Sequence, residues 1–293
     1  MVISKYPSVV TMPEMEKPFP SIVEFLAKVF PSVSRDQWAQ RILEGKVLDD
    51  NRVPISADTK YAPSKRLFYF RETENEPVVP FAEEILFHND EILVACKPHF
   101  LPVTPGGRYV QECLVNRLRT RTGISDLVPM HRIDRETAGL VLFSVNKATR
   151  GLYHELFTQG KIEKTYLALA QVNQPPQENQ WIVENRIVRG EPRFKMKIVP
   201  GVANSRSHIQ LLEIKNNRGL FSLRPTTGKT HQLRLHLSDL GFPIIHDRCY
   251  PDFQPQTEDD FAKPLQLLAK KIQFQDPASG EDRCFQSERG LLW

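Results

Sequence analysis

The first 45 residues show two short amphipathic patterns, and each predicts a helix. Residues 22–30 carry apolar side chains at helical spacing, and Ser21 before them is followed three residues later by a glutamate, as in a capping box. Ser34 opens a second pattern in the same way, and Gly45 supplies the residue that commonly ends a helix. We therefore expect the chain to begin with two adjacent helices.

Short apolar runs follow these helices. Residues 47–48 and 67–70 are strand-like and a polar turn lies after the first, so we expect a small hairpin. The acidic segment 72–80 contains two prolines and shows neither the apolar spacing of a helix nor the alternation of a strand. It is interpreted as linker sequence. The expected organisation is a first domain at residues 1–75, a linker at 76–80 and a second domain at 81–293.

From residue 81 onward, runs rich in Ile, Leu and Val outnumber the helical patterns and do not alternate with them. This order predicts an α+β domain on a mixed, mainly antiparallel sheet rather than a doubly wound fold. The expected strands are residues 92–95, 140–144, 165–170, 209–214, 220–223 and 267–274. The expected helices are residues 109–121, 147–158 and 230–240, and a glycine follows each of the last two.

Composition adds little beyond the class of protein. With 40% hydrophobic and 25% charged residues in 293, the chain is typical of a globular protein, and a net charge of +4 permits a polyanionic partner without requiring one. No apolar run approaches the roughly 20 residues of a membrane helix. Residues 1–20 lack a secretory signal pattern, so a cytoplasmic location is expected. The four cysteines have no C-x-x-C spacing, which argues against zinc, a redox motif or a disulfide framework.

The densest group of charges next to a buried strand pattern is H-R-I-D-R-E-T-A-G at residues 131–139. Asp134 lies between Arg132 and Arg135, and nearby cations favour a charged carboxylate. Asp134 is therefore a candidate nucleophile or base, although an isolated pair of this kind is more often a solvated salt bridge. Glu136 could form a glycosidase-like pair with Asp134, but a spacing of two does not by itself place two carboxylates across a glycosidic bond.

A second cluster reads T-T-G-K-T-H-Q-L-R-L-H at residues 226–236. Its Gly-Lys-Thr looks like the end of a P-loop, but Leu223 stands where that motif needs its first glycine. What remains is a turn leading into a helix, whose first amides and Lys229 form a candidate site for a phosphate or a carboxylate. His231 and Arg234 are three residues apart and share a face of that helix. The two histidines lack metal-ligand spacing.

A third segment, K-T-Y-L-A-L-A at residues 164–170, alternates as a strand. Tyr166 shares a strand face with Ala168 and Ala170, and these small residues leave room in front of its ring. The alternative is a core tyrosine whose hydroxyl is bonded to a neighbour.

These three segments, in this order, resemble the RluA-type pseudouridine synthase family, whose motifs read H-R-L-D-R-x-T-S-G, K-x-Y-x-A and T-G-R-T-H-Q-I-R-x-H. The resemblance extends from about residue 81 to residue 293 and includes a Lys97-Pro98 turn. Departures from the family's motifs include Ile133 and Ala138. Phe100, His246 and Pro251 stand where the family usually has a glycine.

The resemblance implies an isomerase that detaches uracil from C1′ of a uridine in RNA, rotates it and rejoins it through C5, without a redox cofactor, nucleotide or metal. Asp134 is then the catalytic carboxylate, either a nucleophile at C1′ or a base at C2′, and Arg234 is its ion-pair partner. Tyr166 would lie against uracil and take the proton from C5, a role in which a phenol needs a nearby cation.

The same resemblance implies further RNA contacts. Arg132 is expected to fill the space left by the flipped uridine or to contact a phosphate. The other implied substrate-binding residues are His131, Arg135, Thr137, Lys229, Thr230 and His231. Backbone contacts from Arg117, Arg119 and Arg121 are a further hypothesis, with a solvated helix face as its alternative.

The N-terminal residues resemble a divergent RNA-binding module of the ribosomal-protein S-four type, although Asp49 and Asp50 stand where a basic face might be expected. The alternative is a structural module whose Phe25, Phe30 and Trp38 pack on the catalytic domain. The expected partner is a stem-loop of ribosomal or transfer RNA, bound by a monomer.

Two other classes of function were compared with the isomerase. A catalytically silent RNA-binding protein with the same fold should have lost Asp134 or Arg234, and both are present. A nucleoside hydrolase would need a second carboxylate or a metal cluster, for which the sequence offers no pattern. The sequence therefore favours an RNA-modifying isomerase.

Overall fold

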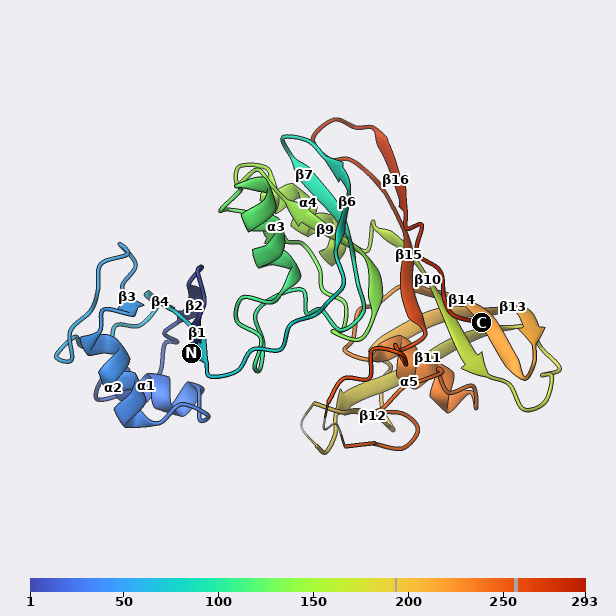
Figure 1. Ribbon diagram of the computed structural model, residues 1–293, viewed down its shortest axis with the longest axis horizontal. Helices are drawn as coiled ribbons and strands as arrows, with labels where there is room; N and C mark the ends of the chain where they lie inside the picture. The colour runs from blue at the N-terminus through green and yellow to red at the C-terminus, as the bar shows by residue number, and fades with distance from the viewer. Residues whose placement is uncertain (193, 256–257) are drawn as a thin grey trace. The chain divides into compact units, whose positions relative to one another are not determined.

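A computed structural model describes residues 1–192, 194–255 and 258–293. The chain forms two compact units (Figure 1). The N-terminal unit comprises residues 1–77 with the segment 106–111, and the second unit comprises residues 78–105 and 112–293. Among the described residues, no helix is both long and apolar enough to cross a membrane.

The N-terminal unit contains both predicted helices, and each begins at the predicted serine. The hydroxyls of Ser21 and Ser34 each accept a hydrogen bond of 3.2 Å from the amide three residues later, and Gly45 follows the second helix with a φ of 69°. The elements of this unit are β1 (Val2–Ile3), β2 (Ser8–Thr11), α1 (Ile22–Val29), α2 (Arg35–Leu43), β3 (Val47–Leu48), β4 (Arg66–Tyr69) and β5 (Glu72–Thr73).

The predicted hairpin is confirmed but is larger than expected. Strand β4 pairs with β3 and also with β2, and β1 pairs with β5. The interpretation of residues 72–80 as linker is therefore wrong for Glu72–Thr73. A strand of two residues has no periodicity of its own and forms because β1 offers it hydrogen bonds.

The aromatic residues of this unit pack inside it. Phe25 and Trp38 are each 1% exposed, and the Phe30 ring lies 5.7 Å from Trp38 between centroids. They belong to one apolar cluster with residues of β3 and β4. These three side chains are therefore part of the core of the N-terminal unit itself.

The second unit is built on a large sheet whose described strands run in the order β12-β11-β13-β14-β10-β15-β9-β7-β6, with β16 beside β15 and β8 beside β9. Strands β9 and β15 pair in parallel and their neighbours pair antiparallel, so the predicted α+β class is confirmed. The strands are β6 (Glu84–His88), β7 (Ile92–Lys97), β8 (Val128–Pro129), β9 (Ala138–Ser144), β10 (Glu163–Gln171), β11 (Gln180–Arg189), β12 (Met196–Val199), β13 (Ser205–Lys215), β14 (Arg218–Pro225), β15 (Leu267–Gln275) and β16 (Asp282–Gln286).

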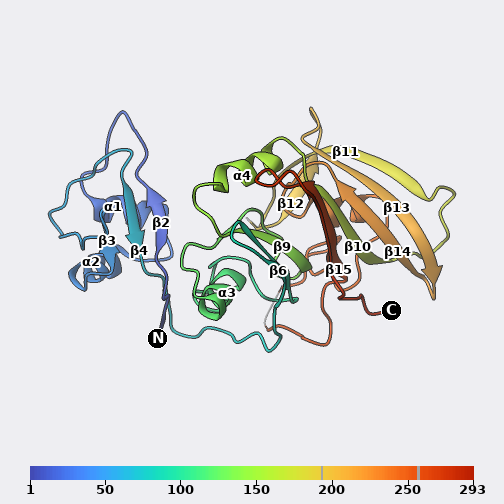
Figure 2. The same cartoon turned by 90° about the horizontal axis from the view of Figure 1, so that it is seen from above.

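Helices lie at both ends of this sheet. Helices α3 (Leu114–Thr122) and α4 (Arg150–Thr158) lie near β6, β7 and β9 (Figure 1). Helix α5 (Gln232–Asp239) lies by β12 and β13 (Figures 1 and 2). Helix α3 begins five residues later than predicted, because Cys113 before it has an extended backbone and the amides of Val110 and Gln111 donate to Glu76 instead of a helical turn.

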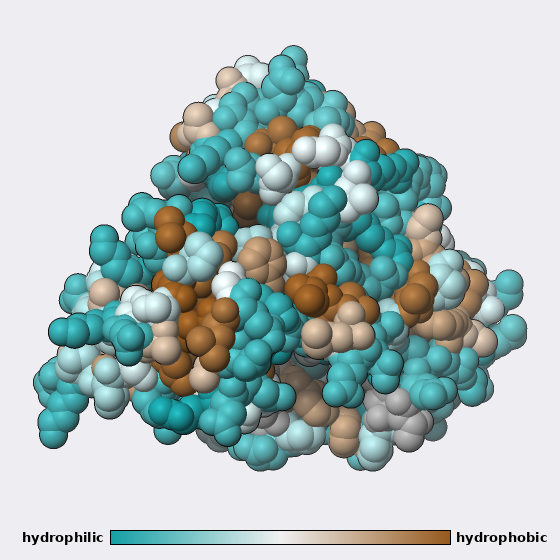
Figure 3. All heavy atoms as spheres, turned by 60° about the vertical axis from the view of Figure 1, so that its left-hand side comes forward, coloured by the Kyte–Doolittle hydropathy of each residue, from teal (hydrophilic) through white to brown (hydrophobic). Residues whose placement is uncertain are grey.

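The six predicted strands are confirmed, each inside a longer strand, whereas β6, β8, β11, β12 and β16 were not predicted. Strand β11 alternates exposed residues, most of them polar, with less exposed ones such as Trp181 and Val183, so it carries a weak apolar signal. The face shown in Figure 3 is mostly hydrophilic, with apolar side chains in small separate patches, as on most soluble proteins.

Strand β9 places the first chemical motif. All seven of its residues are buried, so the preceding loop is fixed against the centre of the sheet. Gly139 has a φ of 113°, and a Cβ there would lie 2.2 Å from the carbonyl oxygen of Ala269 on β15. Only glycine permits this approach of the two parallel strands.

Candidate active site

The loop that carries Asp134 is anchored by hydrogen bonds to its backbone. Lys97, fully buried at the end of β7, donates to the carbonyl of Arg135 at 3.0 Å and to those of Pro98 and Leu101 at 2.9 and 2.6 Å. His99 Nδ1 donates to the carbonyl of Glu136 at 2.6 Å. Burial lowers the pKa of His99 to about 4, so this imidazole is neutral at neutral pH.

Asp134 faces the guanidinium of Arg234, which Asp247 holds on its other side. Arg234 on α5 is 2% exposed, and its Nη1 lies 3.4 Å from Asp134 Oδ2. Its Nε and Nη2 donate to the two carboxylate oxygens of Asp247 at 2.7 and 2.6 Å, a bidentate geometry that fixes the guanidinium plane. Burial alone would lower the pKa of Arg234, but the hydrogen bond and charge of Asp247 and the charge of Asp134 raise it well above its usual value.

This arrangement leaves the Asp134 carboxylate accessible. Its side chain is 26% exposed, whereas that of Asp247 is 1% exposed. The amides of Cys249 and Tyr250 also donate to Asp247 Oδ1 at 2.8 and 3.2 Å. Asp247 is therefore fully engaged in holding Arg234, while Asp134 has oxygen atoms free to meet a substrate.

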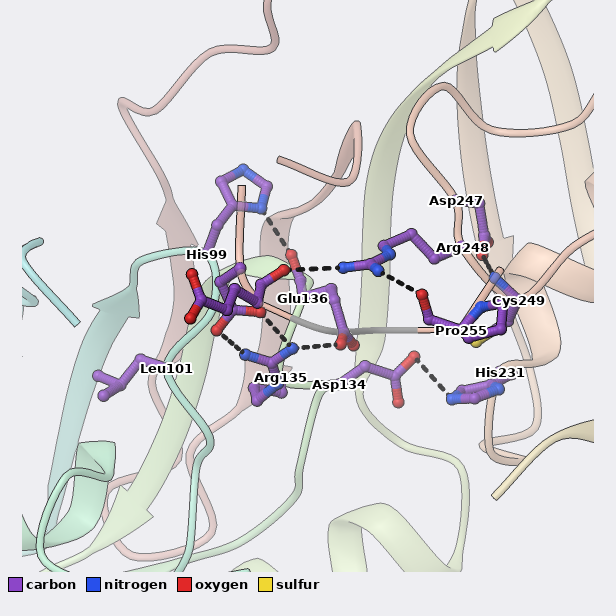
Figure 4. Close-up of polar contacts among 12 residues, drawn as sticks. His99, Leu101, Asp134, Arg135, Glu136, His231, Asp247, Arg248, Cys249 and Pro255 are labelled. Carbon is purple, nitrogen blue, oxygen red and sulfur yellow. Dashed lines mark hydrogen bonds and ion pairs between the residues drawn. The ribbon is translucent and has the colours of Figure 1, made fainter. Parts of the chain in front are cut away.

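His231 is the second group facing Asp134, as Figure 4 shows. Its Nε2 lies 3.9 Å from Asp134 Oδ2 and its Nδ1 lies 3.0 Å from Tyr250 Oη. Burial lowers the pKa of His231, so one of its nitrogens carries the proton at neutral pH. Because a carboxylate only accepts, the favourable tautomer has its proton on Nε2 and receives a hydrogen bond from Tyr250 on Nδ1.

A buried polar network fixes the start of α5. Gln232, which is 4% exposed, donates to the carbonyl of Arg206 at 3.0 Å and to Ser207 Oγ at 2.9 Å, and it accepts from Thr227 Oγ1 and the Lys229 amide. His231 caps the helix with a φ of 55°, a left-handed conformation that is uncommon for residues other than glycine. The network holds this strained residue, whose ring consequently turns to Asp134.

Tyr166 lies on β10, half-buried against the apolar cluster that includes Ala168 and Ala170. Burial, and after it the charge of Asp134, raises the pKa of Tyr166 well above its usual value. The phenol is therefore protonated at neutral pH, and no cation counters these effects. In this state Tyr166 is suited to donate a hydrogen bond rather than to act as a base.

The two arginines adjacent to Asp134 in sequence do not pair with it. Arg135 forms a bidentate pair with Asp259 at 2.7 and 3.0 Å and also donates to Glu136 at 2.9 Å, and Figure 4 shows its guanidinium turned away from Asp134. Arg132 is exposed. Arg234, the ion-pair partner that the resemblance implied, lies within ion-pair distance of Asp134.

Other residues expected to bind substrate have different positions. His131 Nε2 accepts the Leu142 amide at 3.1 Å and its ring stacks on Phe157 at 5.0 Å, and burial lowers its pKa to about 3. The side chain of Thr137 is buried. Lys229 and Thr230 are exposed. Because the Lys229 amide already donates to Gln232 and α5 begins three residues later, the expected anion site has fewer free amides than the sequence suggests.

The arginines of α3 are used inside the protein. Arg117 donates to the carbonyls of Phe81 and Val79 and pairs with Glu83. Arg119 donates to the carbonyl of Leu127, and Arg121 to that of Glu83 at 3.3 Å. These contacts fix α3 to the chain around it and favour a structural role for Arg117 and Arg119, whereas the Arg121 side chain is 55% exposed.

Sequence reasoning gave no role to Asp247, Lys97, Tyr250 or Gln232. Asp247 and Tyr250 act on residues 13 and 19 positions away, so local spacing did not reveal them, and the only signal was that all four residues lie in stretches that resemble the family. Within the described residues no group of three or more His, Cys, Asp or Glu side chains could hold a metal ion.

Comparison with known proteins agrees with this geometry. The family model described as RNA pseudouridylate synthase matches residues 91–239. RNA pseudouridine synthase 7 of Arabidopsis thaliana is 27% identical over 283 residues, which cover 92% of this chain and 69% of that protein. The protein of the same name from Oryza sativa subsp. japonica is 25% identical, over 81% of this chain and 62% of its own length.

Solved structures show the same fold. Human RNA Pseudouridylate Synthase Domain Containing 1 superposes with a TM-score of 0.59 at 24% identity, covering 73% of this chain and 86% of that one. Human RNA Pseudouridylate Synthase Domain Containing 4 does so with a TM-score of 0.55 at 26% identity, covering 70% and 87%. Since the family model matches half of the chain and includes both faces of the Asp134 site, this protein belongs to the RNA pseudouridylate synthase family.

Proposed function

We propose that this enzyme converts uridines in structured ribosomal or transfer RNA to pseudouridine, with Asp134 as its catalytic carboxylate. One observation carries the assignment: Asp134 has accessible oxygens, yet lies 3.4 Å from a buried arginine that Asp247 fixes from the other side. A carboxylate in a structural ion pair would be enclosed by its partners, whereas this one is held at the surface of the site.

The reaction is an isomerisation in which atoms balance without another reactant. The C1′–N1 bond breaks, uracil turns, a C1′–C5 bond forms, and the proton of C5 leaves while N1 gains one. Asp134 either attacks C1′ or removes a proton at C2′. Arg234 places its positive charge beside the Asp134 carboxylate. The bidentate pair with Asp247 keeps the Arg234 guanidinium fixed while Asp134 reacts.

Tyr166 is proposed to contact uracil with its ring and to donate a hydrogen bond through its phenol. Burial and Asp134 keep that phenol protonated in the free enzyme, so the proton of C5 passes to another acceptor, either Asp134 itself or water. His231 is proposed to direct its Nε2 proton at Asp134 or at the sugar bound beside it.

Exposed cations are proposed to contact the RNA. Arg132 precedes Asp134 by two residues and is exposed, as expected of a side chain that replaces an extruded base. Lys229 and Thr230 lie exposed before α5, on the His231 side of the site. Arg135, His131 and Thr137 are assigned to supporting the loop, because their side chains are engaged or buried.

The N-terminal unit has weaker support as an RNA-binding module. Residues 1–77 contain eleven Lys and Arg and eleven Asp and Glu, and several of the cations are paired, as Arg41 and Lys46 are with Glu72. A cytoplasmic location and a monomeric state stay part of the proposal.

The test is to map pseudouridine in total RNA from cells with and without the protein. A uridine modified only when the protein is present identifies the substrate. A transcript containing that uridine, labelled with tritium at C5, should then release tritium with the purified protein and not with its Asp134→Asn variant. Equal release by the variant would remove Asp134 from the mechanism. If no uridine in ribosomal or transfer RNA depended on the protein for its modification, the proposed substrate class would be refuted.

A further inference from the structure

Two aromatic rings lie exposed and in contact near the site, and the mechanism does not use them. Phe194, at the tip of the β11–β12 hairpin, is 54% exposed, and Phe253, in the loop after Tyr250, is 37% exposed. Their ring centroids are 5.3 Å apart with an angle of 56° between the planes. Single exposed apolar side chains are common, but two exposed rings in contact form a patch that can serve as a binding surface.

Both rings are carried by segments with fixed backbones. At the hairpin tip, the Gly190 amide donates to the carbonyl of Lys195 at 2.8 Å and the Lys195 amide to that of Pro192 at 2.7 Å. In the second loop, the Gln254 amide donates to the carbonyl of Arg248 at 2.8 Å, and Arg248 Nη2 donates to that of Pro255 at 3.0 Å. These hydrogen bonds favour this placement of the two rings before any ligand binds.

A chain of contacts leads from the neighbours of this ring pair to the catalytic carboxylate. Lys195 follows Phe194, and its Nζ lies 5.4 Å from the centre of the Tyr250 ring. The Met196 amide donates to Tyr250 Oη at 2.9 Å, and the same oxygen is 3.0 Å from His231 Nδ1. Since His231 faces Asp134, the segments that carry the rings are linked to the catalytic site through Tyr250 and His231.

The hairpin also carries positive charge. Residues 186–197 contain five Lys and Arg and one acidic residue. In the register of the hairpin, Arg189 opposes Met196, and Ile187, two residues along the same face, packs with Tyr250. Arg189 is exposed and is therefore directed to the side on which Tyr250 lies.

Aromatic rings beside cations form the usual surface for an unstacked nucleic-acid base, with the rings against the base and the cations against its phosphates. We propose that Phe194 and Phe253 form a stacking site for a nucleotide that neighbours the target uridine in the substrate RNA. This inference rests on the proposed function, since it assigns a subsite to the same RNA. Stacking there would keep the strand open while the uridine occupies the site beside Asp134.

Binding is the direct test, with a fluorescein-labelled stem-loop that contains the uridine mapped in cells and with Asp134→Asn as background, so that the RNA is not converted. Phe194→Leu retains an apolar side chain of similar size but removes the ring, and it should weaken binding about tenfold, the effect of one stacked base. Phe194→Trp should retain binding. Val202→Ala, at a residue 88% exposed after β12, is the matched control and should change nothing.

A second measurement identifies the nucleotide. Replacing each nucleotide next to the uridine by an abasic residue should weaken binding at one position, and Phe194→Leu should abolish the sensitivity at that position alone. Equal affinity of Phe194→Leu and Val202→Ala, or an unchanged abasic profile, would overturn the proposal and leave the rings as a surface for a protein partner. If the wild-type enzyme still forms pseudouridine in that case, the proposed function stands without this subsite.

Discussion

The two units of this protein each contain a buried charge cluster, and the clusters have opposite composition. In the N-terminal unit one carboxylate, Glu72, meets two cations, with Arg41 Nε at 3.0 Å and Lys46 Nζ at 2.5 Å. In the second unit one cation, Arg234, meets three carboxylates, those of Asp247, Asp134 and, at 3.9 Å, Glu136. The first cluster joins α2 and the residue before β3 to β5, and the second joins α5 to the Asp134 loop.

The difference shows how the same interaction serves stability in one place and chemistry in another. Glu72 is 10% exposed and both of its oxygens are taken by cations, so it has no atom free to react. Arg234 gives its bidentate edge to Asp247 and only one nitrogen to Asp134, which stays 26% exposed. A shared arginine can therefore hold a carboxylate charged and in place without enclosing it.

The largest effect should come from Asp134→Asn. Activity should fall by at least about 10²-fold, because the reacting carboxylate is lost, while the melting temperature stays close to that of the wild type, because Asp247 still pairs Arg234. Tritium release from C5 measures the loss of activity, and a thermal melt measures the melting temperature. A variant that melts much lower would show that the Asp134 contact is mainly structural.

Asp247→Asn should affect both properties. Removing one partner of a buried ion pair is worth about 3–5 kcal/mol of stability, and the released guanidinium should turn onto Asp134 and occupy the oxygens that the substrate needs. We expect kcat to fall with little change in KM, together with a lower melting temperature. Unchanged kcat in a destabilised variant would mean that Arg234 needs no support from Asp247.

Glu72→Gln should affect stability alone, by about 1–2 kcal/mol, because Arg41 loses its partner and Lys46 is left with Glu44. Amide hydrogen exchange in peptides from residues 1–77 should accelerate, while kcat on a minimal stem-loop stays the same. Glu24→Gln, which breaks an exposed pair with Arg35, is the control and should change exchange little. Similar exchange in the two variants would contradict the assignment of Glu72 as a structural centre.

The units should also differ in their response to acid. Residues 1–77 contain no histidine, whereas burial lowers the pKa of His99 and of His236 in the second unit to about 4. The contribution of each histidine to the free energy of unfolding is fully present above pH 6.5, where the imidazole is neutral in the folded and the unfolded chain. That stabilisation is lost between pH 6.5 and 4, where the unfolded chain takes up protons and the folded one does not.

Hydrogen exchange between pH 7 and 4.5 would measure this. The second unit should lose stability as the pH falls, by no more than about 3 kcal/mol for His236, and His236→Gln should reduce the slope. The first unit should show no slope from histidine over this range. Parallel losses in both units would assign the effect to carboxylates instead.

Local structure was predictable where its cause is local. Ser21 and Ser34 start helices because a hydroxyl reaches an amide three residues ahead, and β9 is a strand because a run of buried apolar residues can lie at the centre of a sheet. The residues that resemble the family motifs also identified Asp134 and Arg234 before any geometry was known. Phe100 and His246, which replace the family's usual glycines, keep positive φ angles of 66° and 63°, so the loop shape has persisted without the residue that favours it.

Only the tertiary structure decided which charges meet. In the sequence Asp134 has arginines on both sides, yet Arg135 turns to Asp259 and the cation beside Asp134 comes from α5, one hundred residues away. The reason is that a side chain's partner depends on the direction in which its backbone points it and on what the sheet brings opposite. The sequence by itself determined the helices and the central strands and predicted the reactive residues, whereas the fold determined that Asp247 holds Arg234, that Tyr250 contacts His231, and that Asp134 stays more exposed than Asp247.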